Sequence, residues 1–109
     1  MANKNRDKGH RFERKLLKLL RPIYPKIKTS RNASLELDAN GIDFVNTGSI
    51  AIQSKTLKQR PNFNNVLSKM KTKLPKVFIY KDNKIRGKDG EYAVLRLEDL
   101  ITLLTDLDA

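Results

Sequence analysis

The chain has 109 residues, of which 39% are hydrophobic and 32% charged, with a formal net charge of +11 and no cysteine. This composition is typical of a single globular domain, residues 1–109, and excludes a disordered chain. It also excludes disulfides and thiolate metal sites, and no apolar run approaches the roughly 20 residues that a membrane span needs. We therefore expect an intracellular, cytoplasmic protein without membrane contacts.

The charges are unevenly distributed along the chain. Residues 1–31 and 55–88 are strongly basic, whereas the segment between them contains no Lys or Arg. That segment holds three acids: Glu36, Asp38 and Asp43. An acidic segment between two basic ones is what a cation site inside a phosphate-binding groove would look like. The charge pattern therefore predicts a nucleic-acid partner, and the alternative is a basic surface that is merely solvated.

The first predicted helix covers about residues 6–21 and ends at Pro22, because proline cannot continue a helix. Its inward positions are Phe12, Leu16, Leu17, Leu19 and Leu20. At about 100° per residue, Glu13 falls inside this apolar arc, whereas Arg14 falls outside it. A carboxylate directed at a sheet is costly unless a cation or several donors meet it, so Glu13 is a candidate metal ligand. Alternatively, Glu13 lies at the edge of the arc and reaches solvent or pairs with a nearby Lys.

Five strands and two further helices follow from the rest of the pattern. The predicted elements are a strand over residues 23–30, a polar loop over 31–41, a hairpin of strands over 42–46 and 50–56, a helix between Pro61 and Pro75, a strand over 77–80, a basic loop over 81–90, a strand over 92–97 and a helix over 98–107. The order αβββαββα predicts an α/β (α+β) fold with a small mixed β-sheet flanked by helices.

Two sets of apolar residues are expected to lie on one face of the later helices. The inward residues of the helix after Pro61 are Phe63, Val66, Leu67, Met70 and Leu74, and those of the final helix are Leu100, Ile101, Leu103, Leu104 and Leu107. Either face could form a contact between two copies of the chain. The alternative is that both helices simply cover the sheet.

The predicted hairpin would bring Asp43 and Gln53 together. If residues 47–49 form an odd loop, Asp43 lies opposite Gln53 on the same face, with Cβ atoms about 5 Å apart. A cation could then bridge the Asp43 carboxylate and the Gln53 side-chain oxygen, with Lys55 one step along that face. An even loop would turn Gln53 to the other face. For each residue alone a simpler alternative stands: Asp43 satisfies a turn, and Gln53 or Lys55 is solvated at a strand end.

Several segments between residues 8 and 56 form one recognisable pattern. They are Lys8-Gly9, Glu13-Arg14 followed by Leu16, Lys18, Leu19 and Leu20, the loop Arg31-Asn32-Ala33-Ser34, and the strands Ile42-Asp43-Phe44-Val45 and Ile52-Gln53-Ser54-Lys55. This pattern resembles the archaeal-type Holliday junction resolvases, which belong to the PD-(D/E)xK nuclease superfamily. Beyond residue 56 only the order of elements is compatible with that family.

The resemblance implies a PD-(D/E)xK nuclease-like fold and a role for each matching residue. Asp43 and Gln53 would bind Mg²⁺, for which Mn²⁺ could substitute, with the Ser54 backbone carbonyl as a further ligand and Glu13 assisting. Lys55 would hold the nucleophile or the phosphate. The residues expected to contact DNA are Lys8, Arg14, Arg31, Ser34, Lys58 and Arg60. The family works as a homodimer that cuts symmetric strands of a four-way junction, so DNA and a second copy are the expected partners.

One departure from the family concerns its usual second acid, which is Gln53 here. An amide oxygen can bind a hard cation but carries no charge, so we expect lower metal affinity, with Glu13 or Asp38 able to compensate. Glutamine at this place also occurs in Mrr-like restriction endonucleases of the same superfamily. It therefore does not imply an inactive site, although it leaves the number of metal ions open.

The leading hypothesis is a structure-selective DNA endonuclease that resolves Holliday junctions by metal-dependent phosphodiester hydrolysis. One alternative keeps this chemistry and changes the substrate, giving a restriction-type or repair nuclease on duplex DNA. A second alternative is a non-catalytic DNA- or RNA-binding protein whose site has decayed at Gln53. A plain basic ribosome-associated domain would explain neither an inward Glu13 nor the acidic segment. A compact resolvase would suit a virus or a recombination pathway.

Overall fold

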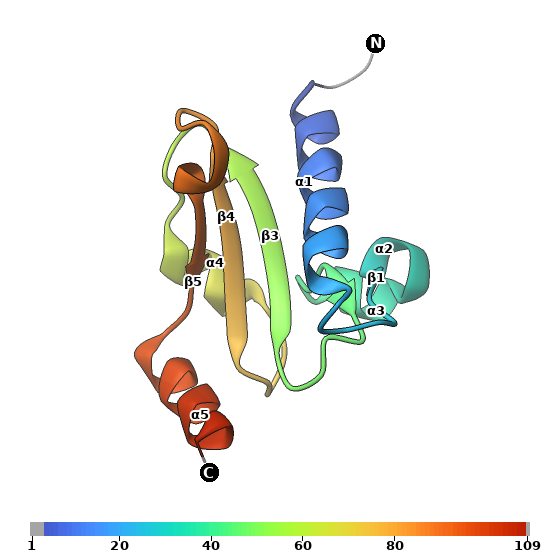
Figure 1. Cartoon of the computed structure of the whole chain (residues 1–109), viewed down its shortest axis with the longest axis vertical. Coiled ribbons are helices and arrows are strands. Elements are labelled where there is room, and N and C mark those ends of the chain that lie inside the picture. Colours follow the sequence, from blue (N-terminus) through green and yellow to red (C-terminus); the bar gives the residue numbers. More distant parts are fainter. Residues whose placement is uncertain (1–3, 109) are drawn as a thin grey trace.

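The computed structural model describes residues 4–108, and their side chains from residue 7 onward. Within these residues it is a mixed α/β structure with five α-helices and two small sheets (Figure 1). The elements in chain order are α1 (Lys4–Leu20), β1 (Lys28–Thr29), α2 (Ser30–Ala33), α3 (Leu35–Ala39), β2 (Phe44–Val45), β3 (Ala51–Leu57), α4 (Phe63–Lys69), β4 (Lys76–Asp82), the 3-10 turn η1 (Gly87–Gly90), β5 (Glu91–Val94) and α5 (Leu97–Leu107). No helix in the described part of the chain is both long and apolar enough to cross a membrane.

The larger sheet has the strand order β3-β4-β5, and it is mixed as predicted. Strand β3 is parallel to β4, with Gln53 beside Phe78 and Lys55 beside Tyr80, and β4 is antiparallel to β5. A separate antiparallel pair, β1 and β2, forms the second sheet. The sequence predicted one sheet; the structure has two because β2 pairs with β1 alone.

Strand β3 lies between two helices (Figure 1). On one face, Ile52 belongs to a cluster with Phe12 and Leu16 of α1. On the other face, Ala51 belongs to a cluster that includes Leu67 of α4, Met70 directly after it, and Phe78 of β4. Since successive side chains of a strand alternate between faces, even-numbered residues of β3 face α1 and odd-numbered residues face α4.

Several local predictions for residues 19–41 were wrong. The strand expected over residues 23–30 is reduced to β1, because the amides of Ile23 and Tyr24 both donate to the Leu20 carbonyl and extend the end of α1 as a turn. Leu19, expected inside, is 57% exposed. The loop expected over residues 31–41 contains α2 and α3, and the Ser34 hydroxyl caps α3 by accepting from the Leu37 amide at 3.3 Å.

The predicted hairpin register was also wrong. The Asp43 amide donates to the carbonyl of Ile52 at 2.8 Å, so Asp43 does not lie opposite Gln53 in a regular ladder. The connecting segment bends away from a simple turn, because Asn46 adopts a φ of 62° and its side chain donates to the Lys26 carbonyl. This bend directs β2 toward β1 instead of β3.

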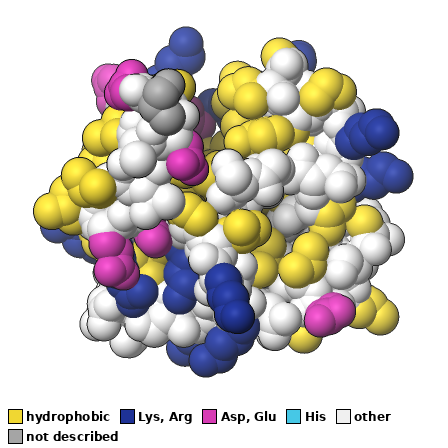
Figure 2. All heavy atoms as spheres, turned by 90° about the horizontal axis from the view of Figure 1, so that it is seen from below, with side chains coloured by type: hydrophobic (Ala, Val, Ile, Leu, Met, Phe, Trp, Pro, Cys, Tyr) yellow, Lys and Arg dark blue, Asp and Glu magenta, His cyan; other side chains and the backbone are white. Residues whose placement is uncertain are grey.

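Helix α5 leaves most of its apolar face uncovered. Ile101 and Leu107, two residues of the apolar face predicted for this helix, are 53% and 78% exposed, so the alternative that α5 simply covers the sheet does not hold. Figure 2 shows hydrophobic and acidic side chains together on the surface at the side where α5 lies. The helix is attached at its start, where the Asp99 carboxylate accepts from the Lys76 amide at 3.1 Å. Leu74, expected inside, is exposed as well.

Candidate functional site

Asp43 lies at the free edge of β3, directly beside Ser54. Its Oδ2 accepts from the Ser54 backbone amide at 2.7 Å and from the Ser54 hydroxyl at 3.3 Å. Its backbone carbonyl accepts from the Ser30 amide at 2.8 Å, which fixes the residue between β3 and α2. The carboxylate thus satisfies an edge amide that would otherwise need a further strand. The structure therefore brings Asp43 to the middle of the Gln53–Lys55 segment.

The pKa of Asp43 is raised from 3.8 to about 6. The largest cause is burial, which disfavours the charged carboxylate, whereas the hydrogen bonds from Ser54 act in the opposite direction. The negative charges of Glu13 and Asp38 raise the pKa further. Asp43 is therefore close enough to both Glu13 and Asp38 to be repelled by their charges. A bound cation would remove that repulsion and lower the pKa.

Glu13 extends from α1 into this acidic cluster, and its side chain is only 14% exposed. Its Oε1 accepts from the Arg31 guanidinium at 2.6 Å. The partner is thus an arginine from α2, not one of the lysines considered from the sequence. Arg31, which was expected to contact DNA, offsets the charge of Glu13 in this arrangement.

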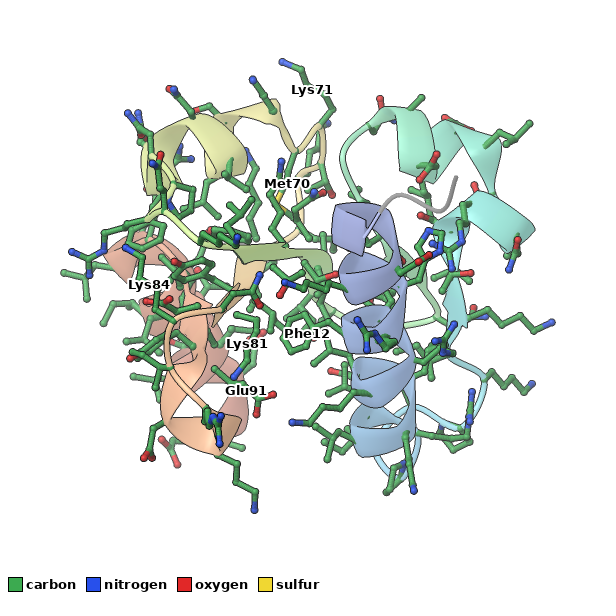
Figure 3. All side chains as sticks on the ribbon, turned by 90° about the horizontal axis from the view of Figure 1, so that it is seen from above. Phe12, Met70, Lys71, Lys81, Lys84 and Glu91 are labelled. Atoms are coloured by element: carbon green, nitrogen blue, oxygen red, sulfur yellow. The ribbon has the colours of Figure 1, made fainter. Side chains whose placement is uncertain are left out.

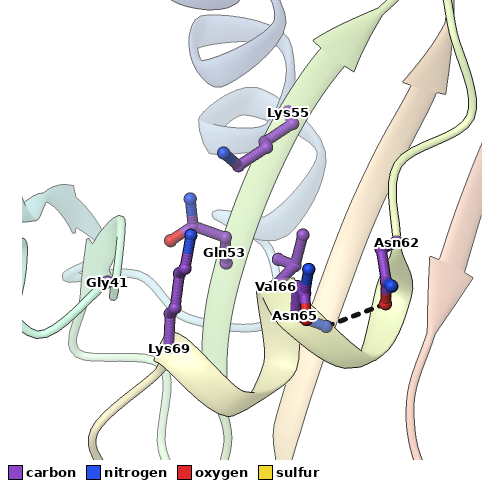
Figure 4. Close-up of a pocket in the computed structure, with 7 residues that line it drawn as sticks. All are labelled: Gly41, Gln53, Lys55, Asn62, Asn65, Val66 and Lys69. Carbon is purple, nitrogen blue, oxygen red and sulfur yellow. Dashed lines mark hydrogen bonds between the residues drawn. The ribbon is translucent and has the colours of Figure 1, made fainter.

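Gln53 and Lys55 lie on the other face of β3 from Ser54, and their side chains point toward α4. They line a pocket of about 260 Å³ together with Asn62, Asn65 and Lys69 of the α4 segment (Figure 4). The Gln53 Oε1 atom is buried and has no hydrogen-bond partner among the described residues. An unpaired buried acceptor is unfavourable unless a donor or a cation binds it, so this oxygen fits a metal ligand.

The oxygen atoms of the candidate site could bind a hard cation, but with modest affinity. Among residues 4–108, no three His, Cys, Asp or Glu side chains form a group that could hold a metal ion. The oxygens that the sequence pattern assigned to a cation lie on two sides of β3: the Asp43 carboxylate and the Ser54 backbone carbonyl at the strand edge, with Glu13 nearby, and the Gln53 amide oxygen on the α4 side. These are oxygen ligands of the kind that Mg²⁺ accepts, but they carry little negative charge.

The residues expected to contact DNA lie in different surroundings. Lys8 lines a hollow of about 360 Å³ beside Phe12 and Lys81, and Figure 3 shows the latter two near each other when viewed from above. Lys58 and Arg60 line an adjoining hollow. The two hollows share Thr56 and Asn83, so these cations gather at one end of the sheet. Arg14 is exposed on α1, and the Ser34 hydroxyl caps α3.

Sequence reasoning missed the residues that α4 contributes to the pocket. Asn62, Asn65 and Lys69 are spaced by three and four residues, so they share one face of the helical segment. That spacing is a signal visible in the sequence, but its meaning depends on α4 packing across β3. Arg11 and Lys15 of α1 line the same hollow as Lys8, and sequence reasoning did not single them out either.

Comparison of the chain with protein-family models, curated proteins and solved structures found no match.

Proposed function

We propose that this chain is a metal-dependent DNA endonuclease of the PD-(D/E)xK type whose preferred substrate is a four-way junction. The observation that carries the proposal is the bond from the Ser54 backbone amide to the Asp43 carboxylate, which joins an acidic cluster to the Gln53–Lys55 segment. The pKa of Asp43 is raised mainly by burial and further by the charges of Glu13 and Asp38, and a bound cation would offset both effects by favouring the charged carboxylate. The mixed α/β architecture is compatible with such a nuclease.

The proposed cation is Mg²⁺, with Mn²⁺ as a substitute. When bound, such an ion supplies Lewis-acid chemistry at a phosphate and lowers the pKa of a coordinated water. Asp43, the Gln53 Oε1 atom and the Ser54 carbonyl would hold it, with Glu13 in or near its coordination shell. The Gln53 oxygen supports this assignment, since it is buried without a hydrogen-bond partner in the part of the chain that the structure describes.

Lys55 would hold the attacked phosphate. Lys55 follows Ser54 directly in β3, and its side chain lines the pocket on the α4 side of the strand. A fixed positive charge there would stabilise the charge that develops on the phosphate oxygens during hydrolysis. The cations at the end of the sheet, among them Lys8, Lys58 and Arg60, would bind the flanking phosphates. DNA binding should then weaken steeply as salt is added.

We also propose that two copies act together, because a junction offers two symmetric strands for cleavage. Two surfaces were candidates for the contact. Phe63 and Val66 of α4 and the following Met70 pack into the core of the chain itself. The apolar face of α5, in contrast, is exposed. Helix α5 is therefore the better candidate for the contact between copies.

The test is incubation of the purified protein with a labelled immobile four-way junction, with Mg²⁺, with Mn²⁺ and with neither. We expect symmetric cleavage of the junction only when metal is present, and slower cleavage of a linear duplex of the same sequence. Equal cleavage of duplex and junction would favour a restriction or repair nuclease. Binding without cleavage in either metal would contradict catalysis and favour a nucleic-acid-binding protein.

A further inference from the structure

The pocket beside β3 contains more than the residues used above. Lys69 extends from α4 toward the Gln53 carboxamide, and the Lys55 ammonium lies on the same side of β3 (Figure 4). We propose that Lys69, with the carboxamide of Asn65, binds a substrate phosphodiester group opposite Lys55. This inference rests on the proposed nuclease function and names additional substrate-binding residues for it.

The composition of the pocket favours an anion. Its lining includes two lysines and no acid, together with the carboxamides of Gln53, Asn62 and Asn65. Carboxamides donate hydrogen bonds, and an ammonium in a partly enclosed space attracts a phosphate more strongly than one in open water. The volume of about 260 Å³ corresponds to roughly eight or nine water molecules. A phosphodiester group therefore fits together with several waters.

The position of Lys69 is fixed relative to the acidic cluster. A Cβ at Gly41 would lie 3.1 Å from the Lys69 carbonyl oxygen, so the end of α4 packs directly against the loop that leads into Asp43. Beside this contact, the Lys71 amide donates to the Asn40 carbonyl at 2.9 Å. Only one residue separates Gly41 from Asp43. A phosphate in the pocket would thus lie between the lysines and the proposed cation site.

The experiment compares Lys69→Ala with Lys73→Ala, which removes the same charge from an exposed residue outside the pocket lining. Junction binding is measured with Ca²⁺ in place of Mg²⁺, at several salt concentrations. For Lys69→Ala we expect the dissociation constant to rise about 10- to 100-fold and the slope of log affinity against log salt to decrease by about one. For Lys73→Ala we expect a change of less than about twofold.

Two further measurements separate phosphate binding from general charge. In cleavage assays, Lys69→Ala should raise KM more than it lowers kcat, because the lost contact is already present when the substrate binds. In NMR titrations with inorganic phosphate, the Asn65 side-chain amide signals should shift in the native protein and not in Lys69→Ala.

Wild-type affinity in Lys69→Ala, or an equal loss in Lys73→Ala, would overturn the phosphate site. So would Asn65 signals that do not respond to phosphate. A native protein that binds the junction but cleaves nothing with Mg²⁺ or Mn²⁺ would instead overturn the nuclease proposal. In that case the binding measurements would still decide whether Lys69 holds a phosphate.

Discussion

The two sides of β3 carry opposite chemistry. At the free edge of the strand, the carboxylates of Asp43 and Glu13 lie close enough to raise the pKa of Asp43. On the α4 side, Lys55 and Lys69 line a pocket without acids. The side chains of consecutive residues, Ser54 and Lys55, point to opposite faces because a strand alternates its side chains. One short segment can therefore present a cation-binding edge and an anion-binding pocket at the same time.

The two regions also differ in how their groups are satisfied. The Asp43 carboxylate is bonded to the Ser54 amide and hydroxyl, so the edge is already organised without a ligand. The Gln53 Oε1 atom, in contrast, is buried without a hydrogen-bond partner within the described part of the structure. An organised carboxylate at the edge and an unpaired amide oxygen on the next residue of the strand are groups that a bound ion could complete.

The largest expected effect comes from removing the charge at the edge. Asp43→Asn keeps the size of the side chain and an oxygen that can accept from Ser54, but loses the negative charge that would bind the cation. We expect junction cleavage to fall by at least about 1,000-fold, while junction binding in Ca²⁺ changes little. The measurement is a single-turnover cleavage assay with a labelled junction. Full activity in this variant would remove the proposed mechanism.

Removing the charge on the pocket side should have a somewhat smaller effect. Lys55→Ala deletes the ammonium that would stabilise charge on the attacked phosphate, and we expect cleavage to fall by about 100-fold or more. The loss should appear mainly in kcat, because the contact strengthens as charge develops. Lys73→Ala, a loss of the same charge at an exposed position, is the control. A loss confined to KM would indicate that Lys55 only binds DNA.

The charge of Asp43 should also have a measurable effect on the free energy of unfolding. Because the pKa of Asp43 is raised from 3.8 to about 6, the native state holds this proton more tightly than the unfolded chain does. The stabilisation is present below pH 4 and is lost as the pH rises through about 6. Asp43→Asn should therefore be more stable than the native protein at pH 7.5, by up to roughly 3 kcal/mol, and equally stable at pH 4.

Thermal unfolding at the two pH values checks this prediction. At pH 7.5 the melting temperature of the Asn variant should be higher by several degrees. Saturating Mg²⁺ should raise the melting temperature of the native protein and have less effect on the variant. A variant that is less stable at both pH values would contradict the prediction that the negative charge of Asp43 destabilises the fold at neutral pH.

The regular helices of this fold could be predicted from sequence, whereas the pairing of the short strands could not. Phe12 and Leu16 repeat at helical spacing, and both are buried in the cluster with Ile52 as expected. The register of Asp43 against β3 depends on the left-handed backbone of Asn46 and on its bond to Lys26, which no local pattern indicates. The prediction that Asp43 lies opposite Gln53 was wrong because these segments do not form a regular hairpin ladder.

The candidate site was likewise only partly predictable. The spacing predicted that Asp43 lies near the Gln53–Lys55 segment, and in the structure Asp43 is bonded to Ser54 within that segment. The α4 side of the pocket was missed, because the role of Lys69 depends on how a helix packs across a strand. Arg31 was expected to contact DNA. Its guanidinium instead bonds to Glu13, and this contact depends on α2, a helix that the sequence did not predict.

A smaller effect should appear when a neighbouring charge is removed from the acidic cluster. Glu13→Gln deletes one of the charges that raise the pKa of Asp43, so that pKa should fall. The measurement is a carbon-detected NMR titration of the Asp43 carboxyl group. Glu36→Gln serves as the control, because Glu36 is exposed and does not contribute to the shift. An unchanged pKa in Glu13→Gln would show that the two carboxylates do not interact.

The smallest effect on stability is expected at α5, the region least connected to the rest of the fold. Leu104 is 42% exposed, so Leu104→Ser should change the free energy of unfolding by no more than about 0.5 kcal/mol. Leu67→Ala, at a residue that is 3% exposed, should cost about 2–5 kcal/mol. If α5 joins two copies, Leu104→Ser should also shift the protein toward monomer in sedimentation velocity experiments. An unchanged dimer would place the contact elsewhere, since an apolar face that binds a second copy cannot tolerate a polar residue at its centre.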